Sequence, residues 1–271
     1  MKKLIITAHD FGLLHSINLG TIYALQNKCN FFSQLSLVVN GRNESSVEAA
    51  KFIRANPQIS CLLDLSFSEL KPLVSGHKTL IDKSGNLKRV YTENWDFNSI
   101  NDYDSQEIIK EMDAQYDWYI EHVGRKPDGL TSRKNVHGDP KILIPVVDLA
   151  KRENLPIRSP LWKWETNYSA QSFVIEEGIK CPTKTFIVCP DWNGHKSYDL
   201  ITDFDQLIRD INNTSGDVHE ILTFAGFVDE ELIRFSSLNW QRGQILDIMK
   251  KKPEILQKLR DNFEIISFKD L

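Results

Sequence analysis

The sequence contains no apolar run of the roughly 18 residues that a membrane helix needs. The apolar stretch that follows Met1 to Lys3 ends at His9, which is too short for a secretory signal peptide. No linker rich in Gly, Ser or Pro divides the chain, and the formal net charge over 271 residues is only −4. We therefore expect one cytoplasmic domain covering residues 1–271, with neither a nucleic acid nor a membrane as partner.

The sequence also lacks the short motifs that indicate a metal site, a redox site or a common enzyme class. Its four cysteines contain no Cys-x-x-Cys pair, so we predict buried thiols. It has no Gly-x-Ser-x-Gly, no P-loop and no Gly-x-Gly-x-x-Gly. His219-Glu220 begins a zincin-like pattern, but Thr223 stands where the second histidine belongs. The cysteines are Cys29, Cys61, Cys181 and Cys189.

What the sequence does contain is an alternation of short apolar runs and longer amphipathic segments. This pattern is typical of parallel strands covered by helices, and about seven βα units favour a closed or nearly closed (β/α) barrel. The expected strands are 4–8, 33–39, 59–67, 129–136, 156–158, 218–224 and 265–268. The expected helices are 16–28, 44–55, 104–123, 141–153 and 204–211, with three helical pieces in 229–262.

Two segments interrupt the alternation. Residues 68–103 are polar and contain Gly76 and Gly85, which predicts an excursion over one rim of the barrel. Residues 159–197 have the least regular pattern, with Trp162, Trp164 and Trp192 among polar neighbours. These tryptophans either stack on a ligand ring or pack in the ordinary way, and the sequence leaves both interpretations open.

Polar residues gather where the predicted strands end, which is where β/α barrels place their reactive groups. His9 and Asp10 follow the first strand directly, and Gly12 lets the chain turn sharply behind them. Leu62 and Asp64 lie in the third strand.

The fourth predicted strand adds a row of polar side chains. Arg133, Asn135 and His137 are spaced by two, so a strand would present all three on one face. Polar groups on a central strand are costly to bury without a ligand or partner, which favours a functional or formerly functional pocket over a purely structural network.

Four segments of the chain resemble the signatures of the YdjC-like carbohydrate deacetylases. Leu4 to Gly12 resembles a strand in which two aspartates precede Phe-Gly, and residues 59–66 with Lys71-Pro72 are similar to a Gly-x-His-x-x-Leu-Thr strand with its later Lys-Pro. Thr131 to His137 resembles Asp-Ser-His-x-His/Asn-Val-His, and Phe224 to Asp229 resembles His-Pro-Gly/Ala-Tyr/Phe-Val/Ile-Asp. The resemblance keeps its order from residue 4 to residue 271 and implies a deacetylase-type TIM-like barrel.

The resemblance implies a hydrolase that removes the N-acetyl group from an amino sugar or chitooligosaccharide. In such an enzyme a divalent metal polarises the amide carbonyl and activates water, a carboxylate is the base, and a histidine protonates the leaving amine. The family's metal ligands correspond to Asp10, Leu62 and Arg133, and its base to His9. Its acid histidine corresponds to Phe224, and the aspartate that opens the fourth-strand motif to Thr131. Because only Asp10 is retained, we expect no metal cofactor.

These substitutions suggest a pseudoenzyme that retains a pocket for a small carbohydrate, made more apolar by Leu62 and Phe224. In this hypothesis Arg133 pairs bidentately with Asp10 and replaces the metal. The alternative is an active hydrolase with a remodelled site of His9, Asp10 and His137, which would bind Mg or Zn.

Two further expectations follow from the resemblance. Arg242 matches a family arginine near the C-terminal helices, and it either reaches the pocket, among whose candidate residues we count it, or braces a helix end, which we favour. The family also makes a homodimer an expectation, although no motif here demonstrates one.

Overall fold

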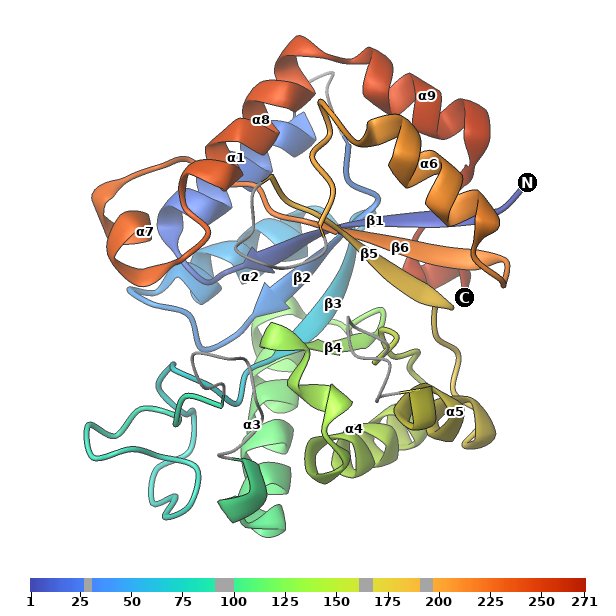
Figure 1. Cartoon of the computed structure of the whole chain (residues 1–271). Helices are drawn as coiled ribbons and strands as arrows, with labels where there is room; N and C mark the ends of the chain where they lie inside the picture. The colour runs from blue at the N-terminus through green and yellow to red at the C-terminus, as the bar shows by residue number, and fades with distance from the viewer. Residues whose placement is uncertain (27–30, 91–99, 161–167, 191–196) are drawn as a thin grey trace.

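The computed structural model describes residues 1–26, 31–90, 100–160, 168–190 and 197–271 (Figure 1). Its centre is a curled parallel sheet that forms a half-barrel, with strand order β4-β3-β2-β1-β6-β5 and β7 paired to the start of β1. The expected barrel-like α/β class is thereby confirmed. The strands are β1 Lys3–Phe11, β2 Gln34–Val38, β3 Ser60–Leu65, β4 Leu130–Ser132, β5 Lys184–Val188, β6 Val218–Thr223 and β7 Glu264–Ile266.

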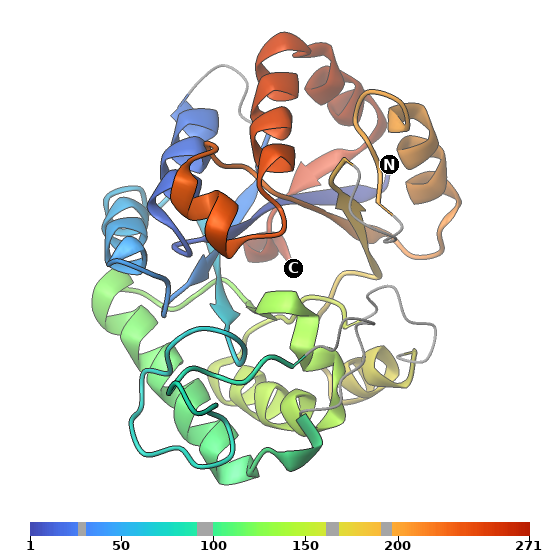
Figure 2. The ribbon, with the colours of Figure 1, turned by 60° about the vertical axis from the view of Figure 1, so that its left-hand side comes forward.

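Helices surround the outside of the curled sheet, as Figure 2 shows. The caps of α3 were evident in the sequence: the Asp104 side chain accepts hydrogen bonds from the amides of Gln106 and Glu107, and Gly124 ends the helix with φ 81°. None of the helices in the described residues has the length and apolar character needed to cross a membrane. The helices are α1 His15–Gln26, α2 Ser45–Ala55, α3 Ser105–Val123, α4 Pro140–Glu153, α5 Tyr168–Glu176, α6 Phe204–Asn213, α7 Glu230–Phe235, α8 Trp240–Lys251 and α9 Glu254–Asn262.

The fourth strand is shorter than predicted. β4 ends at Ser132, and Arg133–Gly138 forms a 3-10 turn in which Lys134 and Asn135 have positive φ. The Ser132 side chain accepts a hydrogen bond from the His137 amide at 2.9 Å and closes the turn. The prediction that Arg133, Asn135 and His137 share one strand face is therefore wrong. Their alternation belongs to a turn that redirects the chain into α4.

The segment expected to be irregular contains a strand. β5 lies within residues 159–197 and pairs with β6 from Lys184 to Val188. By contrast, the strand predicted at 156–158 is only an isolated bridge between Ile157 and Leu130. A five-residue edge strand forms because a neighbouring strand pairs with it. Its own sequence is too short to be distinguished from a loop.

The described part of the polar excursion is fastened to α3 by two glutamates one helical turn apart. Glu107 accepts hydrogen bonds from the backbone amides of Lys78, Thr79 and Leu80. Glu111, fully buried, accepts from the amides of Leu73 and Val74 and contacts a ring nitrogen of His77 at 3.1 Å. The described part of the excursion is thus held against α3 despite having little regular structure.

A buried ion pair spans the interior of the half-barrel. Arg158, which follows the bridge to β4, donates to both carboxylate oxygens of Glu220 on β6 at 2.8 and 2.7 Å. Thr131 on β4 accepts from Arg158 at 2.7 Å, and Thr7 on β1 donates to Glu220 at 2.5 Å. Because β4 and β6 are not neighbours in the sheet, this network joins strands that the backbone ladder does not.

Candidate functional site

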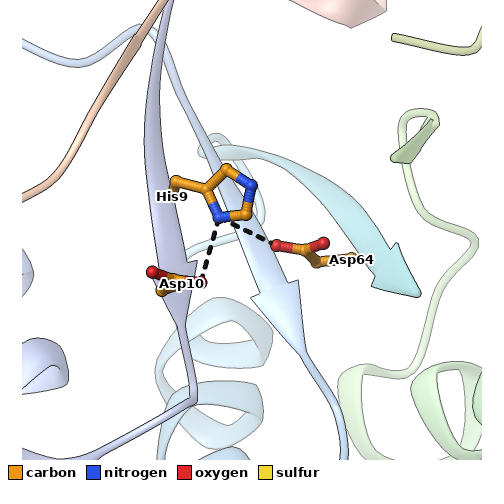
Figure 3. Close-up of side chains that lie close together, drawn as sticks. All are labelled: His9, Asp10 and Asp64. Carbon is orange, nitrogen blue, oxygen red and sulfur yellow. Dashed lines mark ion pairs between the residues drawn. The ribbon is translucent and has the colours of Figure 1, made fainter. Parts of the chain in front are cut away.

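Three titratable side chains meet at the C-terminal ends of β1 and β3 (Figure 3). The Nδ1 atom of His9 lies 3.2 Å from Oδ1 of Asp10 and 3.1 Å from Oδ2 of Asp64. All three side chains are buried, and the His9 ring stacks on Phe224 with a centroid distance of 5.7 Å. The structure thus brings together four of the residues that the sequence singled out.

The backbone around this cluster is strained. Asp10 has φ 66°, and the register between β1 and β2 is interrupted at this point. Glu69, Lys134 and Asn135, which follow β3 and β4, also have positive φ. Non-glycine residues in this region store strain and are concentrated at functional sites, so the geometry supports the strand ends as the site.

The partner of Asp10 is Arg242. This arginine is almost fully buried, donates from Nη2 to Oδ2 of Asp10, and donates from Nε to the carbonyl of Leu238 at 2.9 Å. Of the two roles that the sequence left open, Arg242 therefore reaches the strand-end site, and its bond to Leu238 also ties it to the chain just before α8. A signal was present in the sequence, because Arg242 shares the buried face of α8 with Ile245 and Leu246.

Arg133 lies nearby but does not form the expected bidentate pair with Asp10. Its Nε is 3.9 Å from Oδ1 of Asp10, while its Nη1 is 3.3 Å from Glu69 and 3.4 Å from the carbonyl of Ser68. The 3-10 turn is the reason, since it directs the guanidinium toward the loop after β3. That part of the hypothesis is corrected, and Arg242 takes the role of direct partner.

The two carboxylates of the cluster differ in their electrostatic environment. Burial raises the pKa of Asp10, but the neighbouring His9, Arg242 and Arg133 outweigh it and hold that pKa well below the ordinary value. Burial also raises the pKa of Asp64, and His9 and Arg158 only partly offset it. The site therefore contains one carboxylate held as an anion by cations and another whose protonated form is favoured.

Sequence reasoning missed the ion pairs that flank this cluster. Glu69 accepts from Lys134 at 2.5 Å as well as from Arg133. Burial and the charge of Arg133 lower the pKa of Lys134 to about 8. Lys134 stands inside the motif quoted for the fourth strand, so its position was available, whereas nothing in the sequence singled out Glu69.

The remaining predicted residues lie in the interior and have structural partners. Leu62 packs in an apolar cluster with Ile5, Ile266 and Phe268, and Thr131 accepts from Arg158. His137 lies between the Ser132 hydroxyl at 2.6 Å and the Arg158 carbonyl at 3.1 Å. Burial lowers the pKa of His137 to about 3, so its ring is neutral at ordinary pH.

A cavity of about 10 Å³ lies in this interior, between His9 of the strand-end cluster and Arg158 of the buried ion pair. It is too small for a sugar and is close to the size of one water molecule. Asn135 lies beside it with its Nδ2 at 3.5 Å from the carbonyl of Pro160. Its lining residues are His9, Ser132, Asn135, Arg158, Thr185 and Leu222.

The family's metal-binding arrangement does not fit these residues. Of the three ligand positions, Leu62 offers no donor atom and Arg133 offers a cation, while Asp10 is bonded to Arg242. Within the part of the chain that the structure describes, His9, Asp10 and Asp64 do bring three ligand atoms within 4.8 Å of one another. Imidazole and carboxylate ligands of this kind can hold a divalent ion, but His137 does not belong to the group.

Trp162, Trp164 and Trp192 lie outside the described residues.

Comparison with known proteins shows the family of this chain. The family model described as YdjC-like protein matches residues 3–260. A carbohydrate deacetylase of Clostridium beijerinckii is 27% identical over 272 residues, covering 99% of this chain and 100% of that protein. A chitooligosaccharide deacetylase of Serratia marcescens is 29% identical over 58% of this chain and 59% of its own length.

Solved structures support the fold. A putative cellobiose-phosphate cleavage protein of Enterococcus faecalis superimposes with a TM-score of 0.80 at 20% identity, covering 99% of this chain and 98% of its own. A lactam utilization protein of Thermus thermophilus gives a TM-score of 0.53 at 9% identity, with 98% and 99% covered. At these identities the likeness concerns the fold alone, and the family assignment rests on the sequence match across nearly the whole chain. This chain belongs to the YdjC-like family.

Proposed function

We propose that this chain is a carbohydrate-binding member of the YdjC-like family without the family's metal-dependent deacetylation. The observation that supports this most directly is the environment of Asp10, the one family metal-ligand position that still holds a ligand side chain. Its carboxylate is bonded to the buried Arg242 and faced by Arg133. Of these two cations, Arg242 matches an arginine of the family, whereas Arg133 stands at a family ligand position and puts a positive charge where the family has a metal ligand.

The guanidinium of Arg133 opposes the binding of a divalent ion at this position. An ion about 4 Å from one guanidinium is repelled by roughly 8 kcal/mol at an effective dielectric constant of about 20. Arg133 and Arg242 are both largely shielded from water, with side-chain exposures of 12% and 1%, so solvent screens this repulsion little. Asp10 is stable as an anion without metal because those arginines already provide the positive charge.

The carbohydrate part of the proposal comes from the relatives. The curated proteins that match the chain over almost its entire length are named carbohydrate deacetylases. Loss of metal chemistry leaves the rim residues of the barrel free to bind a sugar without cleaving its amide.

The test combines metal analysis with an activity assay on the purified full chain. We expect no stoichiometric divalent metal, no acetate release from N-acetylated chitooligosaccharides, and binding of carbohydrate on a glycan array. Stoichiometric metal together with acetate release would overturn the proposed loss of catalysis. The absence of any glycan binding would overturn the proposed ligand class.

A restoring variant supplies the matched control. Replacing four residues by the family's residue types rebuilds the base, two metal ligands and the acid on the same backbone, and we expect this variant to bind metal. If it folds and still binds none, the backbone itself has diverged from the family geometry. The substitutions are His9→Asp, Leu62→His, Arg133→His and Phe224→His.

A second candidate function is a hydrolase with a remodelled metal site. It is favoured by the convergence of His9, Asp10 and Asp64, and by Oδ1 of Asp64, which is buried without a hydrogen-bond partner among the described residues. His137 has no part in this candidate, because both of its ring nitrogens have other partners. Metal that copurifies with the wild type and is lost in Asp64→Asn would favour this candidate over the first.

A further inference from the structure

A surface pocket of about 240 Å³ lies beside the site, and three arginines from separate parts of the chain line it. Arg42 follows β2, Arg133 follows β4, and Arg234 lies on α7. Arg133 belongs to both places, since it lines this pocket and lies 3.9 Å from Asp10. Arg133 therefore connects the pocket with the strand-end site.

The rest of the pocket wall is mostly apolar. Leu13, Leu14 and Leu70 line it and belong to one buried cluster beneath it. Phe235 is 49% exposed and adds an aromatic face. The Arg42 guanidinium lies 3.5 Å from the centre of the Phe235 ring, and this contact fixes the orientation of the guanidinium. Apolar walls with a few fixed polar groups are typical of a small-molecule site, and this wall suits the face of a sugar ring.

The arginines are not fully satisfied by protein partners. The Nε atoms of Arg42 and Arg133 have no hydrogen-bond acceptor among the described residues. The carboxylate nearest to Nε of Arg42 is Glu231 at 3.7 Å, beyond hydrogen-bond distance. Arg234 pairs with Glu230 only at the exposed surface, where such a pair contributes little. Those two Nε atoms are buried, but the side chains of Arg42 and Arg234 are 39% and 67% exposed, so their guanidiniums can donate to an anion from outside.

The charge balance indicates how much negative charge the ligand carries. Counting the charged lining residues together with all their ion-pair partners, the five cations exceed the four carboxylates by one charge. One carboxylate matches this excess, whereas a phosphate monoester carries close to two charges. The carboxylate of Glu69 already contacts Arg133, so a carboxylate is an anion that the arginines of this pocket bind. The cations are Arg42, Arg89, Arg133, Lys134 and Arg234, and the carboxylates are Asp10, Glu69, Glu230 and Glu231.

We propose that this pocket binds the carboxylate of an acidic saccharide of the hexuronate type. The carboxylate pairs with the guanidiniums of Arg42 and Arg234, and the sugar ring packs on Phe235 and the leucines. The inference rests on the proposed carbohydrate-binding function and adds the chemical class of the ligand.

The first experiment compares three sugars by NMR titration of the full chain. The probes are methyl β-D-glucuronide, methyl β-D-glucoside and glucose 6-phosphate. We expect the glucuronide to bind about tenfold more tightly than the glucoside, as a charge-assisted hydrogen bond predicts, and to weaken as salt is added. Equal affinity for glucuronide and glucoside, or tighter binding of glucose 6-phosphate than of glucuronide, overturns the inference.

Variants locate the effect in the pocket. The double variant Arg42→Gln/Arg234→Gln should lose the preference for glucuronide and bind the two sugars with equal affinity. Arg209→Gln is the matched control, because Arg209 is an exposed arginine on α6 that bonds only to its helix neighbour Gln206 in the described residues. Urea unfolding confirms that both variants are folded. A glucuronide preference that survives in the folded double variant overturns the inference.

The outcomes separate this inference from the proposed function. Neutral sugars that bind while the glucuronide binds no better defeat the acidic-ligand inference alone. Metal-dependent acetate release defeats the proposed loss of catalysis and leaves the glucuronide preference to be judged by its own titration. Failure of every sugar to bind defeats both.

Discussion

Replacing Arg158 by Met tests the ion pair that spans the interior of the half-barrel. The substitution keeps most of the aliphatic stem but removes both bonds to Glu220, at 2.8 and 2.7 Å, and the bond to Thr131. Glu220 is then left as a carboxylate with no exposed surface and no cationic partner in this network. Removing one partner of a buried pair costs about 3–5 kcal/mol, because the other charge stays buried and uncompensated.

Two contacts place the expected loss toward the lower end of that range. Thr7 still donates a hydrogen bond to Glu220 at 2.5 Å, and Thr185 donates one at 3.3 Å, so the carboxylate keeps two of its hydrogen bonds. We therefore expect the free energy of unfolding in urea to fall by about 3 kcal/mol with an unchanged m-value. The thermal midpoint should fall by roughly 10 °C.

Two variants serve as controls for Arg158→Met. Arg152→Met removes a pair with Asp113 whose arginine side chain is 53% exposed, and should cost less than about 1 kcal/mol. Arg158→Met/Glu220→Met removes both charges and should be more stable than Arg158→Met alone. If Arg158→Met loses no more than Arg152→Met, the buried pair does not hold the two sides of the interior together.

Three shorter predictions concern the pH response, helix packing and the excursion. His137 stays neutral in the folded chain because its pKa is lowered to about 3, whereas in the unfolded chain it takes up a proton near pH 6.5. The free energy of unfolding should therefore fall by up to about 1.4 kcal/mol per pH unit as the pH drops below 6.5. His137→Gln should reduce this slope. Gly20→Ala should destabilise by about 1–3 kcal/mol despite better helix propensity, because its Cβ would lie 2.6 Å from the backbone of Gly226. Glu111→Ala should expose the excursion to proteolysis, since it removes an acceptor buried against two backbone amides.

Each of these predictions has a contrasting result. An unchanged pH slope in His137→Gln would mean that the ring is protonated in the folded chain. Gly243→Ala is the control for Gly20→Ala: its Cβ would meet only a half-exposed Val228 side chain at 3.0 Å, so it should be tolerated. A Glu111→Ala protein that resists protease as well as wild type would show that Glu107 alone anchors the excursion.

The sequence by itself determined most of the elements and the general location of the site. Apolar runs and helix caps such as Asp104 and Gly124 act through neighbours within a few residues, so they could be recognised directly in the chain. His9 and Asp10 were identified for the same reason, because they end a strongly apolar strand. The YdjC-like motifs were preserved in order, and the family followed from them.

Only the tertiary structure decided which side chain pairs with Asp10 and where the fourth strand ends. Arg242 is 232 positions away in the sequence, and no local pattern specifies which of two arginines reaches a given carboxylate. The choice depends on the path of each backbone: α8 buries Arg242 against β1, while the 3-10 turn after Ser132 directs Arg133 toward Glu69. A buried charge is stabilised by whatever cations the fold assembles around it, and that assembly exists only once distant segments have packed.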